Sequence, residues 1–194
     1  MPHNETSDMS FDPSRIETLS AEYAETEPLY AVEKQHFETL PDAFASGKYG
    51  RRDASWVVRW YGRRFLGSFP DEKRRRTEAA FGRNDFGAIR EAIGGAVDAG
   101  GLRTALDSLR TLEGVDVAVA SAFLFHIDPD EYLVVGEPEW NALSVAGELS
   151  EPYPDPPSVE AYERYLDGCR RIAGEADTDL RTLYRALWRA GKRE

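Results

Sequence analysis

The residues of this sequence with the clearest chemical potential are arginines interleaved with tryptophans in "YGRRDASWVVRWYGRRFLG", residues 49 to 67. A helix here would place Arg59 and Arg63, four residues apart, on one stripe. Trp56 and Trp60 would form the adjacent stripe. Guanidinium groups bind phosphates and indole rings stack on bases, so such a surface can bind a nucleic acid. The alternative is an amphipathic helix with tryptophans in the core, covered by arginine stems.

Between these interpretations we favour the core for the tryptophans and a surface contact for the arginines. The candidate phosphate-binding side chains of this segment are Arg51, Arg52, Arg59, Arg63 and Arg64. The nearby tetrad "KRRR", residues 73 to 76, is more typical of a solvated helix start or loop.

The overall charge of −11 ordinarily disfavours a polyanionic partner, because phosphate binding needs lysine and arginine. The basic residues are 20 Arg and 4 Lys, beside 35 acidic residues, a composition that resembles halophilic archaeal proteins. In molar salt the Debye length falls to roughly 3 Å, so only close charge contacts count. Residues 48 to 90 hold twelve basic and five acidic residues. This asymmetry suggests either a nucleic-acid contact or internal ion pairs with the surplus acids.

Several classes of site are disfavoured by composition. Cys169 is the one cysteine, and with His3, His36 and His126 as the only histidines, disulfides and zinc cages are not expected. The first thirty residues are polar and acidic, and no apolar run reaches the length of a membrane span. We therefore expect a soluble, cytoplasmic protein with no membrane partner.

Apolar periodicity predicts helices along most of the chain. The clearest segments are 86 to 97, 102 to 112, 159 to 169 and 180 to 188. Glycine and proline clusters predict breaks at 67 to 71, 99 to 101 and 150 to 158. The fold class is therefore all-α, with eight to ten helices, and "YLVV" (132 to 135) is a short apolar run that could be extended.

The predicted organisation is a single compact domain. We expect a disordered tail over residues 1 to 14, a helical body over 15 to 150, and a C-terminal helical hairpin over 151 to 194 that packs on the body.

A second segment, "LEGVDVAVASAFLF" (112 to 125), joins a tight glycine turn to an almost wholly apolar helix. With the amphipathic helix before it, this is the outline of a helix-hairpin-helix motif over residues 102 to 126. Backbone N–H groups at the start of the second helix, with the positive end of its dipole, can bind a phosphate. The candidate residues are Gly114, Val115, Asp116, Val117 and Ala118.

The segment resembles the DNA glycosylases of the helix-hairpin-helix (HhH-GPD) superfamily, in which "LPGVGxKTA" is followed by a hairpin extension and "VDxxxxR". The family's leucine, first glycine, valine and alanine correspond to Leu112, Gly114, Val115 and Ala120. The later run "YLVVGEPEW" stands on the segment that delivers the family's catalytic aspartate. The resemblance implies a glycosylase-like helical fold over about residues 30 to 150.

By the same resemblance, the family's two catalytic residues are missing. Its lysine falls at Ala118 and its aspartate at Gly136, eighteen residues apart as in the family. A lysine amine can attack C1′ of the sugar and an aspartate can activate water, whereas alanine and glycine can do neither. Gly136, followed by Glu137 and Pro138, can still start a helix. The resemblance therefore implies a scaffold without its chemistry.

Other acids near this position are weak substitutes. Glu137 lies one step further along the helix start, which turns its side chain by about 100°. Asp128 and Asp130, in "HIDPDEY", are typical of a capped turn. His126 is more typical of a hydrogen-bonded core residue than of a general base.

Asp116 stands on the family's second hairpin glycine, where it can adopt a left-handed backbone. Its carboxylate disfavours a phosphate unless a cation intervenes. In the family, hairpin carbonyls hold such a cation, and by position these belong to Arg110, Leu112 and Val115. A K⁺ or Na⁺ ion is therefore the one cofactor that the resemblance suggests, since the cysteines of an iron–sulfur cluster are absent.

The sequence predicts a non-catalytic protein with a degenerate DNA glycosylase fold that binds duplex DNA through the hairpin amides and the arginine-rich helix. Two alternatives stay open. A carboxylate in a cavity beside Gly136 would favour a glycosylase with a relocated acid. Arginines paired with the protein's own acids would favour a structural or protein-interaction module.

Overall fold

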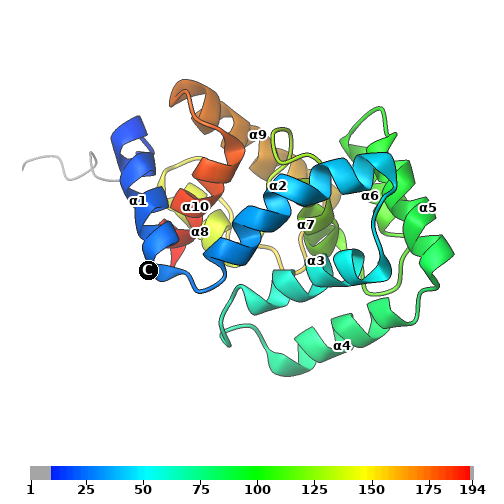
Figure 1. Ribbon diagram of the computed structural model, residues 1–194. Helices are drawn as coiled ribbons and strands as arrows, with labels where there is room; N and C mark the ends of the chain where they lie inside the picture. Colours follow the sequence, from blue (N-terminus) through cyan, green and yellow to red (C-terminus); the bar gives the residue numbers. More distant parts are fainter. Residues whose placement is uncertain (1–9, 193–194) are drawn as a thin grey trace, which may run out of the picture.

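The computed structural model describes residues 10 to 192, and within them the chain forms ten α-helices and no β-strand. They are α1 (Pro13–Thr26), α2 (Tyr30–Ser46), α3 (Arg51–Arg63), α4 (Asp71–Gly82), α5 (Phe86–Val97), α6 (Leu102–Leu109), α7 (Val117–Ile127), α8 (Glu137–Val145), α9 (Val159–Glu175) and α10 (Leu180–Gly191) (Figure 1). The predicted all-α class is confirmed. The predicted tail over residues 1 to 14 lies mostly outside the described residues, and Pro13 already belongs to α1.

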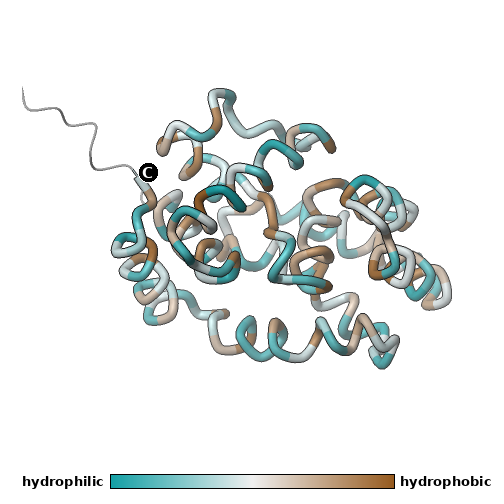
Figure 2. The backbone as a smooth tube through the Cα atoms, turned by 90° about the horizontal axis from the view of Figure 1, so that it is seen from above, coloured by the Kyte–Doolittle hydropathy of each residue, from teal (hydrophilic) through white to brown (hydrophobic). Residues whose placement is uncertain are grey.

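Local sequence explains where many of these helices begin. Five helices have an N-cap residue whose side-chain oxygen accepts the backbone N–H three residues further on. These caps are Asp12, Asp85, Asp116, Ser158 and Asp179. Most of the helices contain both hydrophobic and hydrophilic residues (Figure 2), and each of these helices has one apolar face to bury. No described helix is both long and apolar enough to cross a membrane.

Helix α7 is the centre of the core, because its residues from Val117 to His126 are all buried. Helices α2, α3, α5 and α6 pack around it. The first and last helices meet, since α1 packs along α10, and α10 also lies against α8 and α9 (Figure 1). The first and last helices therefore lie on one side of the molecule, while α4, α5 and α6 lie on the other (Figure 1).

The run 132 to 135 leads from α7 to α8 as a buried segment with no strand partner among the described residues. Hydroxyl groups satisfy its backbone instead. The carbonyls of Leu133, Val134 and Val135 accept from Tyr162 (3.0 Å), Tyr165 (2.8 Å) and Tyr61 (3.1 Å), and the N–H of Val135 donates to Ser121 (3.0 Å). These bonds hold the start of α8, and with it Gly136, against α3 and α9.

Candidate functional site

The hairpin turn is made by a glycine, as expected, but not by the residue at the second glycine position. Gly114 has φ +80°, whereas Asp116 has φ −89°. The expectation of a left-handed Asp116 is wrong, because Asp116 has an extended backbone and is the N-cap residue of α7. Its Oδ1 accepts the N–H of Val119 at 2.9 Å and caps α7.

Helix α4 covers the outer side of this turn. A Cβ on Gly114 would lie 2.7 Å from the carbonyl oxygen of Thr77 and 2.8 Å from the nitrogen of Phe81. Asn84 binds the turn through two hydrogen bonds of 3.0 Å. Its Nδ2 donates to the carbonyl of Glu113, and its Oδ1 accepts the N–H of Glu113. The turn is therefore packed on protein at Gly114.

The five residues predicted to bind phosphate through their amides differ in exposure. Val115, Val117 and Ala118 are buried, and of the five predicted residues Asp116 alone is exposed. Asp116 and Ala118 also line an open cavity between α3, α4 and the start of α7, so phosphate binding by the hairpin amides stays a prediction.

A buried ion pair lies against Gly136, the position that the resemblance gives to the family's aspartate. Arg64 and Glu139 are 2% and 0% exposed, and Arg64 Nη1 donates to Glu139 Oε1. A Cβ on Gly136 would lie 2.8 Å from the other carboxylate oxygen of Glu139. A side chain at Gly136 would therefore have to displace this pair.

Arg64 was predicted as a surface contact, and this prediction is wrong. Its guanidinium lies over the rings of Trp188 (4.7 Å), Phe65 (4.8 Å), Tyr61 (5.0 Å) and Trp60 (5.4 Å). Burial lowers the pKa of Arg64, but the Glu139 carboxylate and nearby groups raise it more, and the net direction is upward. Arg64 is therefore a charged core residue that no external phosphate touches.

A cavity of about 340 Å³ lies beside the hairpin, between α3, α4 and the starts of α7 and α8. Ala118, at the family's lysine position, and Glu137 both line it. The aromatic residues of its lining are Tyr61, Phe65, Phe69 and Tyr153. Glu137 is exposed, so its carboxylate belongs to the wall of an open cavity.

The cations of this cavity are already paired. Lys73 contacts Asp155 at 2.8 Å, and Arg74 contacts Asp71 at 3.2 Å and Glu78 at 3.1 Å. The "KRRR" tetrad occupies the start of α4, and Arg75 and Arg76 also pair with acids one turn away. This confirms the solvated helix start.

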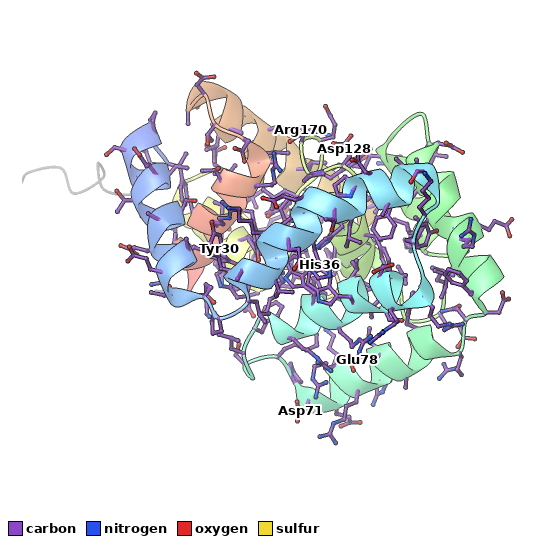
Figure 3. The ribbon with its side chains drawn as sticks, in the orientation of Figure 1. Tyr30, His36, Asp71, Glu78, Asp128 and Arg170 are labelled. Carbon is purple, nitrogen blue, oxygen red and sulfur yellow. The ribbon has the colours of Figure 1, made fainter. Side chains whose placement is uncertain are left out.

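Asp128 does not belong to the cavity. It follows the last residue of α7, and its Oδ1 accepts the N–H groups of Asp130 and Glu131 at 3.2 Å. The eleven residues of α7 separate it from the hairpin by about 16 Å, and Figure 3 places it near Arg170 on the far side from α4. The capped-turn interpretation is confirmed.

His126 is a core residue, as predicted. It is buried, its Nδ1 donates to the carbonyl of Ala122 at 2.7 Å, and its Nε2 has no hydrogen-bond partner. Burial lowers its pKa to about 3. The ring is therefore neutral in the folded protein.

The second candidate surface is the exposed stripe of α3, formed by Arg52, Trp56, Arg59 and Arg63. Arg63 lies 3.6 Å from Glu78, and Arg59 Nε donates to the Ser55 carbonyl at 3.2 Å. Within residues 10 to 192, neither Arg52 nor Arg59 forms an ion pair with an acid. The remaining candidate, Arg51, hydrogen bonds to the carbonyls of Gly82 and Asn84 at the end of α4.

The two tryptophans of this segment differ. Trp60 is 2% exposed and its Nε1 donates to Glu33 at 2.7 Å, which confirms the core interpretation. Trp56 is half-buried and stacks on His36 of α2, with ring centroids 3.6 Å apart and an angle of 2°. Figure 3 shows His36 on the side of α2 that faces α3. The sequence carried no signal for this partner, because it lies on another helix.

The cation site proposed at the hairpin stays a prediction. The carbonyl of Leu112 accepts the N–H of Val115 at 3.3 Å, which leaves one lone pair of that oxygen for a ligand. Arg110 is exposed and lies 3.9 Å from Asp107. Among the described residues, no cluster of three or more His, Cys, Asp or Glu is arranged for a metal ion.

No family model, curated protein or solved structure matches this chain. The resemblance to the helix-hairpin-helix glycosylases therefore rests on the motif between Leu112 and Gly136.

Proposed function

We propose that this protein binds DNA without cleaving the glycosidic bond, and that it contacts the phosphates through the exposed stripe of α3. The observation that supports this most is the pair Arg52 and Arg59, which are exposed and have no acidic partner within residues 10 to 192. Arg103 of α6 and Arg164 of α9 are paired with acids, whereas Arg90 of α5 is also exposed without an acidic partner among the described residues and donates to the Gly47 carbonyl. Guanidinium groups left free in so acidic a chain are suited to an external anion.

The geometry of the stripe suits a nucleic-acid backbone. Arg52, Arg59 and Arg63 stand at helical spacings of seven and four residues, so all three lie on one face. The stripe is about 16 Å long, which is the rise of roughly five base pairs. Because the whole protein carries −11, we expect long-range repulsion at low salt and contact-driven binding when salt screens it.

The proposal includes no excision, because Gly136 has no side chain that could act as the family's aspartate does. The carboxylate of Glu139, which lies against Gly136, is buried in an ion pair with Arg64. A carboxylate that is paired inside the core cannot activate water for attack on a sugar.

Fluorescence anisotropy with a labelled duplex, measured over a KCl series up to molar concentrations, tests this function. Arg59→Gln should weaken binding. It should also reduce the slope of log K for DNA binding against log KCl concentration by about one, which corresponds to the loss of one phosphate contact. Arg164→Gln, on α9, removes the same charge away from the stripe and should leave affinity within two-fold. Equal effects of both variants, or no binding at any salt, would remove the proposal.

A second candidate function is base release with Glu137 as the acid, and the cavity of about 340 Å³ favours it. Its aromatic lining could hold an extruded base, and Glu137 and Ala118 share its wall. The test is a base-release assay on duplexes carrying damaged or mismatched bases. Release that is lost in Glu137→Gln would establish this activity, while DNA binding without release from any substrate would exclude it.

A further inference from the structure

The groove between α2 and α3 has features that phosphate binding alone does not require. It encloses about 370 Å³, which lies in the range of sites for compact ligands, roughly 300 to 1,000 Å³. From the α2 side it is lined by Leu29, Val32 and His36, and from α3 by Trp56 and the arginine stripe. A concave site of this size can receive a group that projects from a nucleic acid.

Flat rings line this groove in a fixed orientation. His36 and Trp56 are parallel at 3.6 Å, and Trp56 continues toward Trp60 at 6.1 Å and 20°. His36 is held because its Nδ1 donates to the carbonyl of Val32 at 2.7 Å, while the ring of His126 meets Trp56 edge-on. A ring pair that is already ordered loses little conformational freedom when another ring stacks on it.

Positive charge flanks the rings. Arg52 and Arg59 are exposed along the groove and form no ion pair with an acid of the described chain, and Arg63 meets Glu78 only at 3.6 Å. The one acid of the groove, Asp53, accepts the N–H of Gly50 at 2.8 Å and serves as a helix cap. The groove therefore combines an aromatic surface with guanidinium groups that all come from α3.

We infer that this groove binds an unpaired nucleobase, so that the preferred ligand is DNA with a bulged or single-stranded nucleotide. The inference rests on the proposed DNA-binding function and narrows its ligand. A base lying against the stack of His36 and Trp56 has its neighbouring phosphates beside Arg52 and Arg59. A base inside a duplex has both faces covered by its neighbours, so it cannot use these rings.

The wild-type protein is sufficient for the main test. Its affinity is measured for a fully paired duplex and for the same duplex with one bulged 2-aminopurine. We expect about ten-fold tighter binding to the bulged duplex, which corresponds to one base stacked on an aromatic side chain, and quenching of the 2-aminopurine fluorescence. Equal affinities with unchanged fluorescence, while the paired duplex still binds, would overturn the inference and leave DNA binding intact. Binding to neither DNA at any KCl concentration would overturn both.

Variants assign the effect to the groove. His36→Ala should reduce the preference for the bulged duplex to about two-fold and leave the affinity for the paired duplex unchanged. Gln35→Ala, at the adjacent exposed position of α2, is the matched control and should change neither. Arg59→Gln should weaken both complexes equally. A bulge preference retained in His36→Ala would show that the base is bound elsewhere.

Discussion

Arg64 of α3 and Glu139 of α8 form an ion pair in the protein interior, against the backbone of Gly136. Gly136 is the position that the proposed resemblance to the glycosylases gives to their catalytic aspartate. The chain therefore has a charge at this junction, but the charge is neutralised within the core and surrounded by aromatic rings. This arrangement serves to join α3 to α8, and its energetics can be measured.

Removal of one partner of this pair should destabilise the protein strongly. Glu139→Gln leaves the Arg64 charge buried without a counter-charge, and we expect a loss of about 3 kcal/mol or more in the free energy of unfolding. The double variant Arg64→Met with Glu139→Met should recover most of that loss, because it removes both desolvation costs. Urea unfolding of Arg64→Met, Glu139→Met and the double variant closes the cycle, and losses that simply add would contradict a direct pairing.

The close contact of Gly114 with α4 predicts that an alanine substitution destabilises the protein more at Gly114 than at Gly147. Gly114 and Gly147 both have φ +80°, but only Gly114 has atoms around its missing Cβ. Gly147→Ala should cost about 1 to 2 kcal/mol for the left-handed backbone alone. Gly114→Ala should cost a further 1 to 3 kcal/mol, roughly, because its Cβ would meet backbone atoms of Thr77 and Phe81. Equal losses in chemical denaturation would mean that α4 does not hold the turn.

His126 predicts a stability change with pH. Its folded pKa of about 3 lies below the ordinary value of 6.5, so only the unfolded chain takes up a proton between these limits. Above pH 6.5 the residue contributes no pH dependence, and below it stability should fall by about 1.4 kcal/mol per pH unit until about pH 3. His126→Phe should lack this component. The difference between the wild-type and variant free energies of unfolding, measured from pH 7 to pH 4, isolates it from the carboxylates, and a constant difference would disprove it.

A buried hydrogen-bond network should contribute to the docking of α1. The hydroxyl of Tyr23 donates to Glu33 at 2.6 Å and lies 3.1 Å from the hydroxyl of Tyr184. Tyr23→Phe leaves a buried carboxylate with one donor fewer, and we expect a loss of about 1 to 3 kcal/mol. Tyr30→Phe is the control on the neighbouring ring, expected within about 0.5 kcal/mol. Similar effects of both substitutions on urea unfolding would argue against the network.

Local patterns were sufficient for the helices and for the core. The apolar run of residues 117 to 125 has no polar face, so it must lie inside the protein, and α7 does. The predicted break at 99 to 101 separates α5 from α6, and a glycine makes the hairpin turn. These features follow from side-chain periodicity and backbone preference, which depend on neighbours in sequence.

The burial of Arg64 in the candidate site could not be predicted from the sequence, because it depends on a contact between distant segments. Arg63 and Arg64 are adjacent and chemically identical, yet about 100° of helical rotation sends one to solvent and the other into the core. The partner that makes burial of Arg64 possible, Glu139, is 75 positions away. No local pattern can distinguish the two arginines.

The sequence by itself determined the all-helical class, the buried helix α7 and the glycine turn at Gly114, because these are properties of residue type and spacing. Only the tertiary structure decided that α4 covers the hairpin, that Arg64 is internal, and that His36 stacks on Trp56. Each of these depends on how two helices pack, and packing is set by the shapes and charges that meet across the interior.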